Sequence, residues 1–290
     1  MKRIIIPLSL SLLFFSCEEA TKTEIPEVEA KTEEKVDRVE QIENIVYNIP
    51  SPTETVSILQ KAGAKYVFDF PNDPQNVDDY QTTTKKALNM GVYGADLTYA
   101  SVFNKSTETS FFLTCVTKLG RKLNVEQVFN EDVNERIQDN VDNRDSMQVI
   151  VNEVFWELDA YLKEQGRENV STLIVVGGWI ESLYIASQFV KLNPDNEEMK
   201  QRIAEQKYSL DNLIGLIKSN GNKVGVEDIL QSLEELKELF DQIKEVKQPA
   251  TEANTEGAVM IGNVITLEMS DVLLSKIIDK VEEIRTEIVS

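Results

Sequence analysis

Residues 173–189, with the sequence LIVVGGWIESLYIASQF, decide the fold of this 290-residue chain. They form the most apolar segment after residue 17, and Glu181 is the single charged residue among them. Placed on a helix, the segment is apolar nearly all round, and a helix of this kind normally lies at the centre of a bundle. We therefore expect a central helix here, with other helices packed around it.

Four other segments carry apolar residues at the three- and four-residue spacing of an amphipathic helix. They cover residues 147–162, 199–217, 229–243 and 274–288, and Ser270 is a suitable N-cap for the last of them. Their apolar faces consist of Met147, Ile150, Val154, Leu158, Tyr161 and Leu162; Met199, Ile203, Leu210, Leu213, Ile214 and Ile217; Ile229, Leu233, Leu236, Phe240 and Ile243; and Leu274, Ile277, Ile278, Val281, Ile284 and Ile288. The chain is therefore predicted to be mainly α, as a multi-helix bundle.

Two short apolar runs break the helical pattern. Residues 258–261 (AVMI) and 264–267 (VITL) flank Gly262–Asn263, a pair typical of a tight hairpin turn. One small β-hairpin is therefore expected near residues 258–267. For residues 65–70 the pattern leaves two interpretations open, a short strand and the frayed end of a helix.

Charge and composition argue against several classes of function. The chain has 50 acidic and 30 basic residues, a formal net charge of −20, and no histidine. This negative charge argues against nucleic acid as a partner, because a phosphate backbone must be met by a basic surface. Without histidine there is no Ser-His or Cys-His nucleophile pair and no mixed Cys/His zinc site. We expect neither an enzyme nor a bound cofactor or metal.

Two acidic clusters are the places to look for calcium, which prefers oxygen ligands. The clusters are Asp69, Asp73, Asp78 and Asp79, and Asp132, Asp139, Asp142 and Asp145. Neither has the ligand spacing of an EF-hand loop, and chance clustering is expected in so acidic a chain. We expect both clusters to be solvated loops.

The amino terminus has the pattern of a targeting signal. Lys2 and Arg3 precede a short apolar stretch, residues 4–15, which is too short for the roughly 20 residues that a membrane span needs. Residues 13–17 (LFFSC) resemble the lipobox of bacterial lipoproteins, although Phe14 stands where that family usually has Leu, Val or Ile. The resemblance implies a signal peptide of residues 1–16, removed before Cys17, whose sulfur then carries a diacylglycerol. An ordinary secretory signal is the alternative interpretation.

The residues after the signal indicate where the protein resides. The pair Glu18–Glu19 is similar to the export signal of surface lipoproteins of Bacteroidota. The resemblance implies a lipid anchor in the bacterial envelope, at the outer membrane, on its periplasmic or surface face. Residues 17–50 hold ten acidic and four basic residues, too polar to bury a core, and are predicted to be an acidic flexible tether. Residues 51–290 are then the α-helical domain, with a subdivision near residue 194 left open.

Two features within the helices point to a ligand site or to close packing. Glu181 is either a ligand-binding or acid–base group, or a paired carboxylate that fixes helix packing. Small residues at helical spacing, Ala87, Gly91, Gly94, Ala95 and Thr98, are expected to pack closely against Gly177 and Gly178. A cleft beside these glycines would be lined by Tyr93, Tyr99, Trp179 or Tyr184.

Three hypotheses of function follow from the sequence. The first is a membrane-anchored envelope lipoprotein with a non-enzymatic binding or scaffolding role through its helix surfaces. Its expected partners are the membrane, through the N-terminal lipid, and an envelope protein. The second is a small-molecule-binding or sensory helical domain with a pocket between the Gly91 and Gly177 helices. The third is an enzyme that works with carboxylates, lysine or tyrosine alone.

Overall fold

A computed structural model shows how the helical segments pack. It describes residues 52–61, 63–219, 225–249 and 263–290. The predicted signal peptide (1–16), Cys17 and the predicted tether (17–50) lie outside these described residues. The fold is mostly helical, with nine α-helices and one small two-stranded sheet within the described residues, which confirms the predicted fold class.

The predicted central helix is α7, Glu168–Leu192. It contacts α2 (Pro52–Lys61), α3 (Thr83–Val102), α6 (Arg144–Glu164), α8 (Glu197–Ser219) and α10 (Asp271–Val289). By length and composition α7 could cross a membrane, but 83% of its most apolar window is buried inside this protein. Such burial on all sides is what a helix at the centre of a bundle shows.

Helices α3 and α7 pack through their glycines, as predicted. A Cβ atom at Gly91 would lie 2.0 Å from the carbonyl oxygen of Ile174, and one at Gly177 would lie 1.9 Å from that of Leu88. No side chain fits into such a contact, so only glycine lets the two backbones approach this closely. The ring of Phe155 on α6 covers Gly94 on the same stretch of α3.

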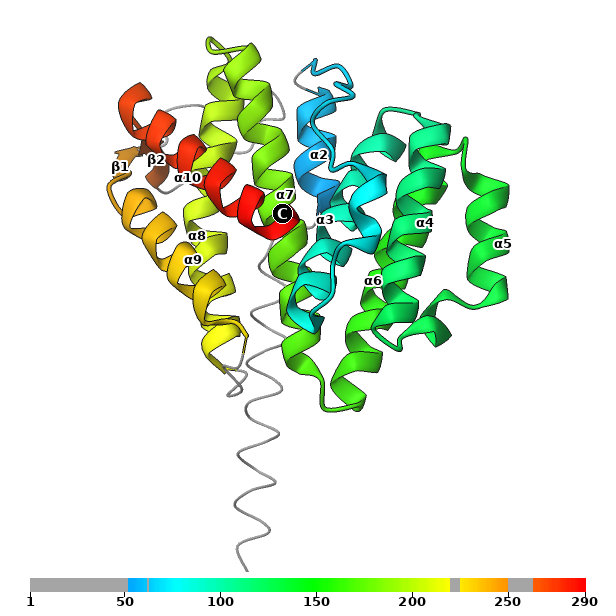
Figure 1. The fold of residues 1–290 in the computed structure, drawn as a ribbon. Coiled ribbons are helices and arrows are strands. Elements are labelled where there is room, and N and C mark those ends of the chain that lie inside the picture. Colours follow the sequence, from blue (N-terminus) through cyan, green and yellow to red (C-terminus); the bar gives the residue numbers. More distant parts are fainter. Residues whose placement is uncertain (1–51, 62, 220–224, 250–262) are drawn as a thin grey trace, which may run out of the picture. The chain divides into compact units, whose positions relative to one another are not determined.

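The other helices of the first half lie on one side of α7, to the right in Figure 1. Helix α4, Ser106–Lys122, packs on α3, and α5, Glu131–Asn140, packs on α6. Two short 3-10 helices, Pro74–Asp78 and Glu126–Phe129, precede α3 and α5. Before α3, residues 65–70 form neither a strand nor a helix. The backbone N–H of Val67 there donates to the hydroxyl of Tyr99 at 2.9 Å, so a side chain replaces a regular hydrogen-bond ladder.

The helices of the second half bury the predicted apolar faces. Helix α8 packs on α7, and α9, Glu227–Phe240, packs on α8 and α10. The apolar seam of α9 is therefore buried within the chain itself. Ser270 caps α10 as predicted, since its hydroxyl oxygen accepts from the N–H of Leu273 at 3.2 Å.

The carboxyl end of α10 is fastened to α3 (Figure 1). The side-chain amide of Asn89 donates to the carbonyl oxygen of Ile288 at 2.8 Å. The Lys85 ammonium donates to the backbone oxygen of Ser290 at 3.2 Å. These bonds satisfy carbonyl groups that have no partner inside their own helix.

The sheet differs in its pairing from the expected hairpin. Strand β2, Asn263–Glu268, contains the predicted strand 264–267, but it pairs antiparallel with β1, Lys244–Pro249. Asn263 lies opposite Pro249 inside the sheet, and Gly262, the other residue of the predicted turn, lies outside the described residues. The other predicted strand, 258–261, lies outside the described residues. Strand β1 (KEVKQP) escaped prediction because backbone pairing, rather than an apolar pattern, defines it.

Candidate functional site

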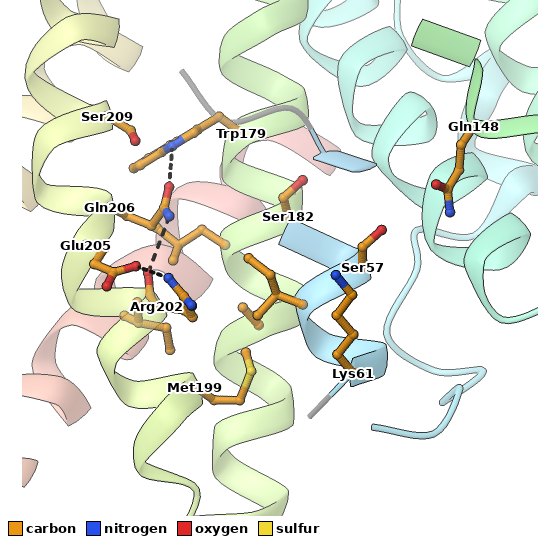
Figure 2. Close-up of a pocket in the computed structure, with 14 residues that line it drawn as sticks. Ser57, Lys61, Gln148, Trp179, Ser182, Met199, Arg202, Glu205, Gln206 and Ser209 are labelled. Carbon is orange, nitrogen blue, oxygen red and sulfur yellow. Dashed lines mark hydrogen bonds and ion pairs between the residues drawn. The ribbon is translucent and has the colours of Figure 1, made fainter. Parts of the chain in front are cut away.

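A pocket of about 580 Å³ opens between α2, α7 and α8, with Gln148 of α6 also in its lining. Pockets of this size are typical of small-molecule sites. Figure 2 shows α7 at the back of the pocket, flanked by side chains from α8 on one side and from α2 on the other.

One face of α7 forms the floor of the pocket. Trp179, Ser182, Leu183 and Ala186 stand three, four and seven positions apart and therefore share one side of the helix. The Trp179 side chain is only 4% exposed, and its indole N–H donates to Oε1 of Gln206 on α8 at 3.2 Å. The floor is therefore apolar, and its largest ring is fixed by a hydrogen bond.

The rim of the pocket carries two cations and one carboxylate. Lys61 stands on α2, and Arg202 on α8 forms an ion pair with Glu205, with 2.8 Å between Nη1 and Oε2. Figure 2 shows Lys61 and Arg202 on opposite sides of the floor. Arg202 is 44% exposed, and an ion pair in this setting contributes little to stability. The rim is thus weakly basic in a chain whose net charge is −20.

Glu181 lies on another face of α7 and is fully buried. Arg285 of α10 binds it in a bidentate way, with Nε 3.0 Å from Oε2 and Nη2 3.2 Å from Oε1. The guanidinium carbon of Arg285 also lies 4.7 Å from the ring centre of Tyr184. Burial raises the pKa of Glu181, and the charge of Arg285 acts against this rise. Glu181 is therefore a paired carboxylate within the packing of three helices.

A second buried carboxyl group, Asp96 of α3, stands beside Glu181. Its Oδ2 accepts from the backbone N–H of Asn72 at 3.1 Å, while its Oδ1 accepts from no donor among the described residues. Burial, and after it the charge of Glu181, raises the pKa of Asp96 well above its ordinary value. The raised pKa favours the protonated form of Asp96, and a protonated carboxyl group at this position is placed to donate to the neighbouring carboxylate of Glu181.

Sequence reasoning missed Asp96, although a signal was present. Asp96 is the single acidic residue of α3, as Glu181 is the single charged residue of residues 173–189. When each of two helices that pack on each other contains a single acidic residue, the two acidic residues are candidates for pairing. Arg285 gave no such signal, because charged residues surround it in the sequence of α10.

The structure separates the residues that were predicted to share one ligand site. Tyr93 is fully buried, and its hydroxyl donates to the carbonyl oxygen of Asp73 at 2.8 Å. Tyr99 is buried too, and Tyr184 lies against Arg285. Only Trp179 of this set lines the pocket described above. At Gly91 and Gly177 themselves the two backbones are in contact, so no ligand fits between them there.

The two acidic clusters do not converge on a metal-binding geometry among the described residues. The expectation that both are loops is wrong for the second cluster, because Asp132 and Asp139 lie on α5 and Asp145 lies on α6. Within residues 52–61, 63–219, 225–249 and 263–290, no three acidic or cysteine side chains stand close enough together to hold a metal ion. In the first cluster, Asp78 instead binds Lys118 at 2.6 Å and Lys122 at 2.9 Å. In the second, Asp142 accepts a hydrogen bond from Ser106.

Comparison of the chain with protein-family models, with curated proteins and with solved structures finds no match. The geometry of the pocket and the sequence of the amino terminus therefore carry the functional argument.

Proposed function

We propose that this chain is a lipid-anchored lipoprotein of a bacterial envelope that binds a partner or ligand without catalysing a reaction. The amino-terminal sequence supports the location, because residues 13–17 resemble a lipobox and end at Cys17. Two or three acyl chains on one cysteine give stable membrane anchoring. The acidic residues 17–50 would then serve as a tether between the membrane and the helices.

The pocket between α2, α7 and α8 is the observation that carries the binding role. Its floor is formed by the most apolar helix of the described chain, and it remains open to a ligand. Apolar pockets with a few polar groups at the rim are the usual form of binding sites. We therefore place the binding function at this surface.

The buried carboxyl groups support binding rather than catalysis. An acid or base must come within hydrogen-bond reach of its substrate. Asp96 and Glu181 have raised pKa values, but both are fully buried, and Glu181 is occupied by Arg285. Their arrangement fits a role in fastening α3, α7 and α10 to each other.

The anchor is tested by intact mass and detergent partitioning of the protein from its native envelope. The expected result is a mass increased by the lipid, together with partitioning into detergent. Both should be lost in Cys17→Ala. An unmodified, water-soluble wild-type protein would contradict the lipoprotein proposal and leave an exported helical domain.

The binding role is tested by isolating the protein from detergent-solubilised envelopes and identifying what is bound to it. Ala186→Leu adds bulk to the pocket floor, and Ala160→Leu makes the same change at an exposed position of α6. We expect a bound component that Ala160→Leu retains and Ala186→Leu loses. Equal recovery with both variants would contradict binding at the pocket, and repeated recovery of nothing would count against a binding role.

A small-molecule-binding or sensory domain is the second candidate function. The volume of the pocket favours it, because about 580 Å³ lies within the range of ligand pockets. Thermal-shift measurements separate the two candidates: a small ligand at 100 times its dissociation constant stabilises the protein by about 2.7 kcal/mol without any macromolecular partner.

A further inference from the structure

We infer that the pocket binds a small amphipathic acid, with its apolar chain against Trp179 and the α7 floor and its carboxylate between Lys61 and Arg202. This inference rests on the proposed binding role of the pocket and does not depend on the lipid anchor. It names the chemistry of the ligand, which the proposed function leaves open.

The apolar part of the ligand follows from the buried apolar residues that line the pocket. Trp179, Leu183 and Ala186 of α7 meet Ile203 and Met199 of α8, and all five side chains are at most 4% exposed. They line the pocket with apolar groups from two helices, and one of these groups is an aromatic ring fixed by a hydrogen bond. An alkyl chain or ring laid on this surface would leave water, which favours binding roughly in proportion to the area covered.

The charge of the ligand follows from the rim. Lys61 forms no ion pair with any residue that the structure describes. The pair between Arg202 and Glu205 uses Nη1 of Arg202, and a guanidinium carries further N–H donors on its other nitrogens. Two cations on opposite sides of an apolar floor suit an anionic group, and charge-assisted hydrogen bonds to a carboxylate are among the stronger ones.

The size and setting of the site favour a free small molecule over a macromolecule. A volume of about 580 Å³ accommodates a drug-sized ligand. A large polyanion would also meet the acidic surface of a chain with net charge −20, whereas a small acid meets only the rim.

Tryptophan emission provides a direct test. The chain has two tryptophans, Trp179 in the pocket and Trp156, which lies on α6 and is 69% exposed. In Trp156→Phe, Trp179 becomes the single reporter. Decanoate below its micelle concentration serves as the probe, decanol as the uncharged match, and decyltrimethylammonium as the cationic match.

We expect decanoate to change the emission of Trp179 in a saturable way, and decanol to bind at least tenfold more weakly. Removing one rim charge, by Lys61→Gln or Arg202→Gln in the single-tryptophan protein, should weaken decanoate binding about tenfold, as the loss of one charge-assisted hydrogen bond predicts. Lys276→Gln removes an exposed charge from α10, away from the pocket, and should leave binding unchanged. Ala186→Leu should weaken binding, whereas Ala160→Leu should not.

Several results would overturn the inference. Equal binding of decanoate, decanol and the cation would show that the rim does not select an anion. A response that Ala186→Leu leaves intact would place the binding elsewhere. A response to phosphatidylglycerol vesicles but not to free decanoate would assign the pocket to a membrane lipid.

Failure of the ligand class is distinguishable from failure of the binding role. If no probe changes the emission, yet Ala186→Leu still removes a component isolated from envelopes, the pocket binds and only the proposed ligand is wrong. If Ala186→Leu affects neither measurement, the pocket itself is not the binding site and both proposals fall.

Discussion

The two faces of α7 share an apolar background, yet one is closed and the other is open. On the closed face Gly177 touches the backbone of α3, and Glu181 is held by Arg285. On the open face Trp179 meets α8 through a side chain, and a pocket remains. The smallest residues let a neighbouring backbone approach, whereas the largest keeps its neighbour at side-chain distance. The position of these residues, rather than mean hydropathy, decides where a core helix leaves room for a ligand.

The largest difference between the faces should appear when an arginine is removed from each. Arg285→Met keeps an unbranched apolar stem but leaves Glu181 buried without its cation, at an expected cost of about 3–5 kcal/mol. Arg202→Met removes the exposed ion pair of the open face and should cost less than about 1 kcal/mol. Urea unfolding followed by circular dichroism measures both. Equal losses would contradict the contrast between the two faces.

The next largest effect is expected at the glycine contact. Gly177→Ala places a Cβ atom 1.9 Å from the carbonyl oxygen of Leu88, and the backbones of α3 and α7 must then separate. We expect a loss of about 3 kcal/mol in the free energy of unfolding, at the upper end for overpacking. A variant as stable as the wild type would show that the two helices can move apart at little cost.

Asp96→Asn tests the raised pKa of Asp96, which lies on the closed face, through the pH dependence of the free energy of unfolding. Because the pKa of Asp96 is raised in the folded protein, folding takes up a proton at any pH between the unfolded and folded pKa values. The stability from Asp96 is thus fully present below about pH 4 and falls as the pH rises, by about 1.4 kcal/mol per pH unit. Asparagine does not titrate, so the stability of the variant relative to the wild type should increase with pH.

Urea unfolding of both proteins at pH 5, 6, 7 and 8 measures this difference. A difference that stays constant with pH would mean that Asp96 is ionised in the folded protein, next to an ionised Glu181. The two carboxyl groups would then share the single charge of Arg285.

The smallest effect is expected at Gly215, in the interior of α8. A Cβ atom there would meet nothing within 4 Å. Gly215→Ala should therefore raise the free energy of unfolding by about 0.5–1 kcal/mol, through helix propensity alone. Gly215→Ala is measured in the same way as Gly177→Ala and is its matched control. A loss of stability in Gly215→Ala would show that glycine serves a further purpose in α8.

Much of the fold could be predicted because the spacing of apolar residues within each helix is enough to identify its buried face. The apolar faces of α6, α8, α9 and α10 follow from spacing alone, and nearly all of their predicted residues are buried. The Ser270 cap and the glycine contact between α3 and α7 depend on short, local patterns. Strand β1 could not be predicted, because its sequence is mostly polar and only backbone pairing with β2 makes it a strand.

The site was harder to predict because it joins residues from distant helices. Glu181 and Arg285 stand 104 positions apart, and nothing local marks one as the partner of the other. Side chains of α2, α6, α7 and α8 line the pocket. The sequence of any one of these helices does not predict how the four are placed relative to each other. Trp179 could be proposed because it directly follows Gly177 and Gly178, beside which a cleft was expected.

The pairing of Glu181 with Arg285 also sets an order of events during synthesis. The ribosome completes α3 and α7 well before it adds Arg285, so the carboxylate of α7 remains without its cation while the following 104 residues are made. A chain interrupted before Arg285 could bury that carboxylate only at a high cost in free energy. We therefore expect α7 to reach its native packing only when the chain has been translated through α10. Fragments that end before Arg285 should remain open to proteases.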